Sequence, residues 1–167
     1  MQFEYQISRS IHDEHQNTIT YLEKLETELL KHGHDKAPDL AEGDLGSIIW
    51  QLIPLIEEEI GIHFQFEEES IFPILDTAGD SGITFLLTEE HRTILPLGER
   101  LMELARGTRN NTLDDETWSE LRRLGIELIE RLVSHIQKEE MGLLPMIETL
   151  IDEEQDAELS NNYAMMR

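Results

Sequence analysis

The sequence contains no cysteine among its 167 residues. Disulfide bonds, cysteine-held iron–sulfur clusters and cysteine nucleophiles are therefore excluded, and any bound metal must be held by nitrogen and oxygen ligands. Basic residues are also few, 13 against 36 acidic ones, which gives a formal net charge of −23. Because such a surface repels phosphate backbones and anionic lipids, we expect neither a nucleic-acid partner nor binding to a membrane surface.

Long apolar runs are lacking as well. The first ten residues do not contain the apolar core of a secretion signal. The longest apolar stretch, residues 48–56, is too short to cross a bilayer. We therefore expect a cytoplasmic protein. The remaining composition, 39% hydrophobic and 29% charged, is typical of one globular domain of ordinary size.

The pattern of apolar residues predicts an all-α fold. No run of alternating β-branched residues occurs, whereas four segments repeat apolar residues every three or four positions. The predicted helices span residues 8–31, 44–71, 81–105 and 115–144. Prolines predict a bend at Pro54, an end of the second helix at Pro73 and a bend at Pro96. Short loops between amphipathic helices favour an up-down-up-down four-helix bundle.

The end of the chain looks different from the bundle. A short helix is expected over residues 146–151, after the interruption at Pro145. Residues 153–167 are mostly acidic or polar, so we expect a frayed tail there. The predicted organisation is thus one domain over residues 1–152 followed by a polar acidic tail over residues 153–167.

An internal repeat is the most informative feature of the sequence. Residues 63–75 align with residues 135–147 at an offset of 72, and His, Gln, both Glu and Pro occupy equivalent positions. A shorter pair at an offset of 76 aligns Glu14 and His15 with Glu90 and His91. The chain therefore divides into two helix pairs, and each pair carries one His followed by one His-x-x-x-Glu motif.

Each His-x-x-x-Glu motif lies on a helix face that otherwise belongs to the core. The apolar stripe of the second predicted helix runs through Ile60 directly into His63 and Glu67. Residues four apart share one face, about 6 Å apart along the axis, so both polar groups should point inward. The fourth predicted helix repeats this arrangement with His135 and Glu139.

Inward-facing carboxylates imply a compensating cation, because an unpaired buried charge costs several kcal/mol. His15 and His91 lie within the apolar stripes of the first and third predicted helices. Four imidazoles and two carboxylates that converge in a bundle interior make a metal site. The candidate metal ligands are His15, His63, Glu67, His91, His135 and Glu139.

For four residues near the candidate ligands, the sequence allows more than one role. His12 lies one turn before His15 and could replace it as a ligand, and Tyr21 could approach the site from the same helix. Glu14 and Glu90 precede the repeat-paired histidines. They are either hydrogen-bond acceptors behind the ligands or, as we expect, residues of solvated helix faces.

At these residues the chain resembles the hemerythrin-like, or HHE cation-binding, family. The family pattern places His on the first and third helices and His-x-x-x-Glu on the second and fourth. The resemblance covers roughly residues 8–150 and implies two iron ions, bridged by the two glutamates and an oxo or hydroxo group. Manganese or zinc would also suit imidazole and carboxylate ligands. One open position would remain for a small ligand, either a diatomic gas or peroxide.

The sequence departs from the classical oxygen-carrying hemerythrins in two places. Leu95 stands where they have a second third-helix His, and Glu139 belongs to His-x-x-x-Glu where they have His-x-x-x-x-Asp. We therefore expect binding or sensing of dioxygen, nitric oxide or peroxide, rather than strict oxygen carriage. The alternatives are iron storage or delivery, including iron–sulfur repair, and a di-iron peroxidase or nitric oxide reductase-like enzyme. The sequence identifies no protein partner.

Overall fold

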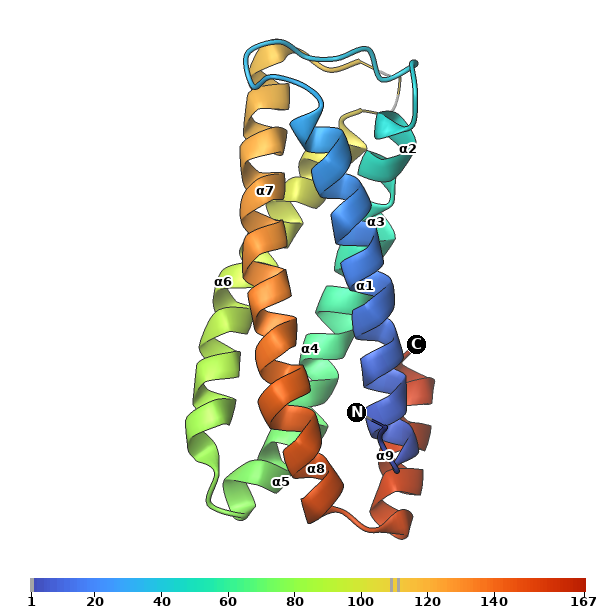
Figure 1. Cartoon of the computed structure of the whole chain (residues 1–167), viewed down its shortest axis with the longest axis vertical. Coiled ribbons are helices and arrows are strands. Elements are labelled where there is room, and N and C mark those ends of the chain that lie inside the picture. The colour runs from blue at the N-terminus through green and yellow to red at the C-terminus, as the bar shows by residue number, and fades with distance from the viewer. Residues whose placement is uncertain (1, 109, 111) are drawn as a thin grey trace.

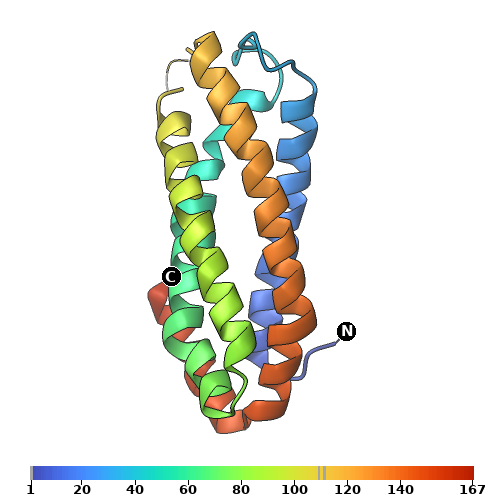
Figure 2. The same ribbon diagram turned by 90° about the vertical axis from the view of Figure 1, so that its left-hand side faces the viewer.

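Four helical columns lie side by side around a common core in the computed structural model of the chain (Figure 1). The structure describes residues 2–108, 110 and 112–167; Met1, which begins the N-terminal segment, and Arg109 and Asn111 lie outside the described residues. Neighbouring columns run in opposite directions, as the rotated view also shows (Figure 2). The predicted all-α bundle is confirmed.

The first and third columns are each a single long helix. They are α1 (Gln6–Leu30) and α6 (Ser81–Arg106), close to the predicted bounds. The helix α6 continues through Pro96. Both helices bury apolar residues at intervals of three or four, for example Leu22 and Leu25 in α1, so one stripe of each faces the core.

The second column alternates between α-helical and wider π-helical turns. Its segments are α2 (Leu45–Trp50), α3 (Leu52–Pro54), η1 (Leu55–Ile62), α4 (His63–Phe66), η2 (Glu67–Ile71) and α5 (Phe72–Thr77). The predicted end at Pro73 is wrong, because the column continues to Thr77. Pro73 lies in the first turn of α5, where proline is tolerated because the missing N–H would have no partner in that helix.

The fourth column repeats the last part of this backbone arrangement, from η2 onward. It consists of α7 (Asp115–Lys138), η3 (Glu139–Leu143) and α8 (Leu144–Leu150), with Pro145 in the first turn of α8. The π-helical turns η2 and η3 are separated by the repeat offset of 72 residues. In each turn the glutamate carbonyl accepts from the N–H five residues on. Each turn precedes a proline that cannot donate, and π-turns of this kind are frequent at functional sites.

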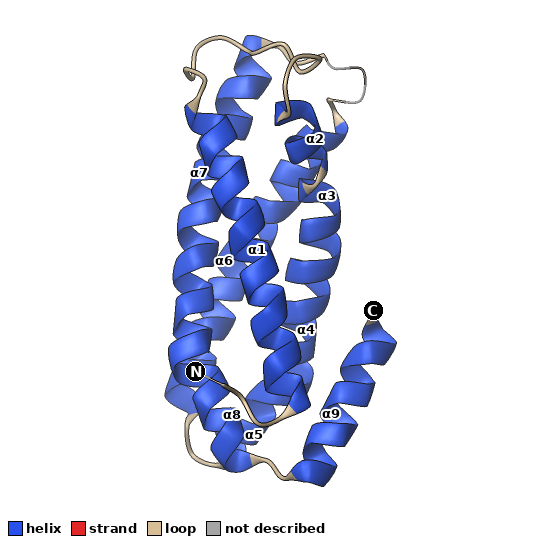
Figure 3. Ribbon diagram, turned by 45° about the vertical axis from the view of Figure 1, so that its right-hand side comes forward, coloured by secondary structure: helices blue, strands red, loops and turns tan. Residues whose placement is uncertain are grey.

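A further helix, α9 (Glu153–Met166), follows the bundle, so the expectation of a frayed tail is wrong. Asp152 and Gln155 form a reciprocal capping box that starts the helix. Leu159 and Tyr163, four residues apart, are buried, and α9 packs against α1 (Figure 3). These two buried residues anchor one face of a helix whose overall composition is polar, and the Asp156 carboxylate accepts from the backbone N–H groups of Gln6 and Ile7 in α1.

The apolar core is divided into two clusters along the bundle. One cluster contains Leu22 and Leu132, and the other contains Ile11 and Leu143. The six candidate ligands are themselves buried and lie in sequence near the boundary between these clusters on their helices. A buried polar layer therefore crosses an otherwise apolar interior. No helix among the described residues combines the length and apolar character needed to span a bilayer.

Candidate metal centre

The six residues proposed as ligands meet at one level of the bundle, and every column contributes at least one. His15 comes from α1, His91 from α6, and the two His-x-x-x-Glu motifs from the second and fourth columns. All six side chains are buried; Glu67 is 0% and Glu139 is 1% exposed. Two fully buried carboxylates are unusual in the core of a globular protein and need positively charged partners.

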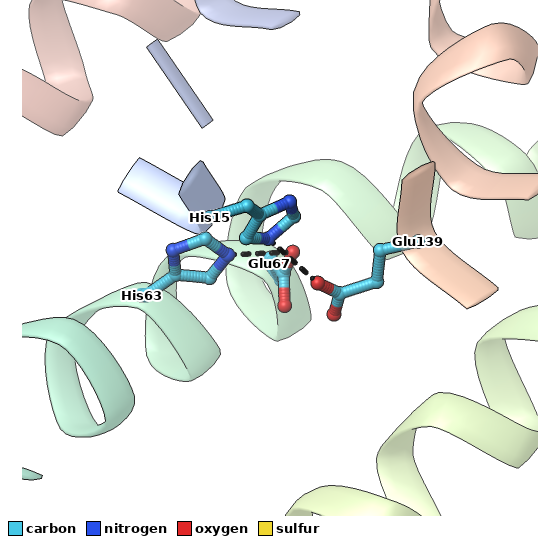
Figure 4. A group of neighbouring side chains, drawn as sticks. All are labelled: His15, His63, Glu67 and Glu139. Carbon is cyan, nitrogen blue, oxygen red and sulfur yellow. Dashed lines mark hydrogen bonds and ion pairs between the residues drawn. The ribbon is translucent and has the colours of Figure 1, made fainter. Parts of the chain in front are cut away.

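The residues form two groups that could each hold a metal ion. The first group is His15, His63, Glu67 and Glu139, and the second is Glu67, His91, His135 and Glu139. Within each group the ligand atoms lie within 4.8 Å of one another. Figure 4 shows the first group, in which both imidazole rings point toward the two carboxylates. Glu67 and Glu139 belong to both groups, whereas each histidine belongs to one.

Each glutamate directs one carboxylate oxygen toward a histidine of the first group and the other oxygen toward a histidine of the second group. Glu67 Oε1 lies 3.0 Å from His63 Nε2, while its Oε2 lies 3.3 Å from His91 Nε2. Glu139 Oε2 lies 2.9 Å from His15 Nε2, while its Oε1 lies 2.6 Å from His135 Nε2. This is the arrangement expected of carboxylates that bridge two cations.

The donor set fits metal ions better than it fits an internal hydrogen-bond network. His15 Nε2, Glu67 Oε2 and Glu139 Oε1 are buried, yet none has an aligned hydrogen-bond partner among the described residues, despite nearby polar atoms. The Nε2 atoms of His91 and His135 face each other at 3.1 Å. Buried polar atoms without partners are costly, and a cation between them would satisfy both imidazole and carboxylate donors. Imidazole with carboxylate suits iron, manganese and zinc.

Charges within the layer shift the protonation of its members. Burial lowers the pKa of His63, but the nearby carboxylates of Glu67, Glu139 and Glu59 together outweigh burial and raise the pKa to about 9. Burial is likewise outweighed at His91, where Glu139 and Glu67 raise the pKa to about 9. Burial alone would raise the pKa of Glu139, but His135 and its other histidine neighbours hold it well below its ordinary value. Protons and metal ions therefore compete for the same nitrogens.

A second carboxylate lies behind every one of the four histidines. The Nδ1 atoms of His15, His63, His91 and His135 lie 2.6, 3.2, 2.8 and 2.8 Å from oxygens of Glu140, Glu14, Glu68 and Glu90, respectively. A carboxylate that accepts from Nδ1–H fixes the tautomer and leaves Nε2 free to face the centre. Such pairs are typical of histidines that bind metals.

The expectation that Glu14 and Glu90 belong to solvated faces is therefore wrong. Their side chains are only 14% and 23% exposed, and each contacts the histidine of the partner helix in its own pair. The repeat contained the signal that could have found them, because Glu14 aligns with Glu90 and Glu68 aligns with Glu140. Their role requires two helices to meet, so one helix face alone did not reveal it.

The two other open candidates lie outside the ligand groups. His12 Nδ1 lies 2.7 Å from Glu140 Oε2, so it supports the carboxylate that holds His15. The Tyr21 hydroxyl donates to the carbonyl of Ile48 at 2.7 Å. Neither residue is among the ligand groups that the described residues form.

Residues of and after α9 contribute contacts that the sequence did not predict. The Tyr163 hydroxyl donates to Glu14 and lies 3.5 Å from His63 Nδ1. Arg167 forms ion pairs with Glu14 and Glu59. Tyr163 and Arg167 therefore both contact Glu14, the carboxylate that lies behind His63.

The chain matches a known protein family. The family model described as Hemerythrin HHE cation binding domain matches residues 6–157. The matched region includes all four columns and the six residues of the two groups. A search of curated protein sequences finds no significant match.

Proposed function

Because the chain belongs to the hemerythrin HHE cation binding domain family, we propose that it holds two iron ions and binds or senses a small ligand. The ligand would be dioxygen, nitric oxide or peroxide. His15 and His63 would hold one ion, His91 and His135 the other, and Glu67 and Glu139 would bridge them. The ions would supply Lewis acidity and reversible electron transfer to the ligand.

One observation carries this proposal: both glutamates are shared between the two ligand groups, with one oxygen directed at each group. Two histidines and two bridging carboxylates give four protein donors to each ion. Iron commonly takes five or six, so positions would remain for other ligands. Open positions are a feature of reactive rather than purely structural metal sites.

The surrounding residues would keep the centre ordered and dry. The Nδ1-bound carboxylates orient the four imidazoles, and apolar clusters lie on both sides of the polar layer along the bundle. Exclusion of water strengthens the attraction between the carboxylates and the cations. It also favours small ligands over large polar substrates.

The proposal is tested by counting metals in the purified protein and recording its near-ultraviolet spectrum. Two irons per chain, an oxo-bridge charge-transfer band and a reversible spectral change on exposure to a ligand are expected. One metal, zinc alone, or no metal after reconstitution with iron would contradict it. Iron that a chelator removes rapidly would instead favour storage or delivery, and multiple turnovers of peroxide or nitric oxide would favour an enzyme.

A control variant separates specific loading from adventitious binding by this acidic chain. Glu69→Gln changes an exposed carboxylate two residues after Glu67, in the same π-helical turn. It should load as much metal as the unchanged protein. An equal loss of metal in Glu69→Gln and in a ligand variant would indicate binding to the acidic surface.

A further inference from the structure

A small cavity lies beside the candidate metal centre. Its volume is about 20 Å³, and residues of both ligand groups line it. The polar lining comprises His15, Thr18, Glu59, His63, His135 and Glu139, while Ile60, Phe64, Leu132 and Ile136 complete the wall. A volume of roughly 10–15 Å³ is enough for one water-sized molecule. The cavity can therefore hold one very small molecule in reach of either metal position.

Glu59 has a distinctive place in this wall. It lies four residues before His63 on the second column, so the two share a helix face. Its Oε1 accepts from Arg167 Nη2 at 2.8 Å, which leaves Oε2 as the other hydrogen-bonding atom. That Oε2 atom is buried and has no hydrogen-bond partner among the described residues. Nothing in the assigned ligand groups uses this carboxylate.

We infer that Glu59 selects the ligand of this cavity by accepting a hydrogen bond from it. The favoured class is a small molecule that carries a proton to donate, such as hydrogen peroxide. This inference rests on the proposed function, since it concerns the small ligand of that same centre. Arg167 acts as a positioning residue, because its hold on Oε1 keeps the other oxygen turned away from solvent.

The physical reason is the cost of an unpaired buried oxygen. A ligand that donates a hydrogen bond to Oε2 removes this cost, whereas a ligand without a proton leaves the oxygen unpaired. Sites built to hydrogen-bond a ligand discriminate strongly against analogues that lack the matching group. An anion without a proton is disfavoured further by the charge of the carboxylate.

The test compares hydrogen peroxide with azide, which carries no proton at neutral pH, in the iron-loaded protein. Optical titrations of the diferric form, with stopped-flow detection for peroxide, give an apparent affinity for each probe. Glu59→Leu removes the acceptor, Glu59→Gln keeps an acceptor oxygen but removes the charge, and Glu58→Gln is the matched control. Glu58 is exposed and adjacent in sequence. Metal content is measured for every variant by elemental analysis.

Glu59→Leu should weaken peroxide binding roughly tenfold or more, in line with loss of a hydrogen bond to a charged group. Azide affinity should stay the same or rise. Glu59→Gln should keep peroxide affinity within a few-fold and increase azide affinity, while Glu58→Gln changes neither. All variants should retain two metals per chain.

Several results would overturn the inference. An unchanged peroxide-to-azide ratio in both Glu59 variants would show that the carboxylate does not contact the ligand. Loss of metal in Glu59→Gln would make Glu59 part of metal binding instead. If Glu59→Leu fails to load metal while Glu59→Gln loads two ions, a higher azide affinity in Glu59→Gln supports the inference, and an unchanged azide affinity overturns it. If the unchanged protein loads iron but binds neither probe, the ligand-binding function fails together with this inference; a changed ratio supports both.

Discussion

The two halves of the bundle, residues 6–77 and 81–150, follow one plan at the centre and differ at its edge. Each half carries a histidine, a His-x-x-x-Glu motif, a π-helical turn and a following proline. Each histidine also has a second carboxylate at Nδ1, here called its outer carboxylate. The halves differ in which residues bind the outer carboxylates Glu14 and Glu90. Glu14 is held by Tyr163 and Arg167, from and after α9, whereas Glu90 is held by Lys138 of its own half.

The difference indicates which parts of the site depend on the repeat. The two metal positions need the same inner donors, and the internal repeat supplies them twice. Glu14 and Glu90 are partly exposed and need a partner of opposite charge or a donor, but any nearby element can provide it. We therefore expect loss of a shared glutamate to affect both metal positions, and loss of a histidine or of a carboxylate at the edge to affect one position only.

The largest effect is expected from loss of a shared carboxylate. Glu139→Ala removes a donor from both groups, so metal content should fall from two ions per chain to nearly none. His15→Ala and His91→Ala each remove a donor from one group only, and each should lose mainly one ion. Elemental analysis after dialysis against a weak chelator measures this. Equal metal loss in all three variants would argue against bridging glutamates.

Metal uptake should depend on pH in both halves. His63 in the first half and His91 in the second each have a pKa of about 9 without metal, so binding near neutral pH must displace protons. Affinity should rise with pH by up to roughly tenfold per unit for each displaced proton, and level off above about pH 9. Calorimetry in buffers of different ionisation enthalpy counts these protons. No proton release near pH 7.5 would contradict the prediction.

The same shifts predict how the metal-free fold responds to pH. These pKa values are higher in the folded chain than the ordinary histidine value of 6.5. Their contribution to the free energy of unfolding is therefore complete below about pH 6.5 and is lost as the pH rises through about 9. Urea unfolding of the metal-free protein should show lower stability at pH 10 than at pH 7. Metal-loaded protein should lack this loss.

A smaller effect, confined to one half, is expected from the outer carboxylates. Glu14→Gln and Glu90→Gln each weaken the orientation of one histidine, and loss of such partners typically lowers metal affinity 10–100-fold. Chelator competition measures the affinity. Glu14→Gln should have a clear effect in a His91→Ala background and little further effect in a His63→Ala background. Glu90→Gln should have a clear effect in a His63→Ala background and little further effect in a His135→Ala background.

The smallest effect is expected at the start of α9. Asp152→Ala removes the capping box and should destabilise this helix by about 1 kcal/mol. Amide hydrogen exchange in α9 should accelerate, and the His15–His63 position should bind metal slightly more weakly because Tyr163 and Arg167 are less well held. Asp114→Ala is the matched control, since Asp114 caps α7 by accepting from the Thr117 N–H at 2.7 Å. It should leave metal affinity unchanged.

The sequence by itself determined the bundle and the inner residues of the candidate site. Helical periodicity marks which positions turn inward, and a polar residue at such a position is conspicuous because burial is costly. That is why His63 and Glu67 could be proposed as ligands from their place beside Ile60. The repeat then doubled the pattern, and the structure brings all six residues together.

Only the tertiary structure decided what surrounds that centre. Glu14, Glu59 and Tyr163 lie on helix positions that look ordinary in isolation, since contact with another column gives each its role. The continuation past Pro73 and the folding of α9 likewise depend on packing against neighbours. Local periodicity records which side of a helix is buried, but contacts across helices far apart in sequence arise only when the columns assemble.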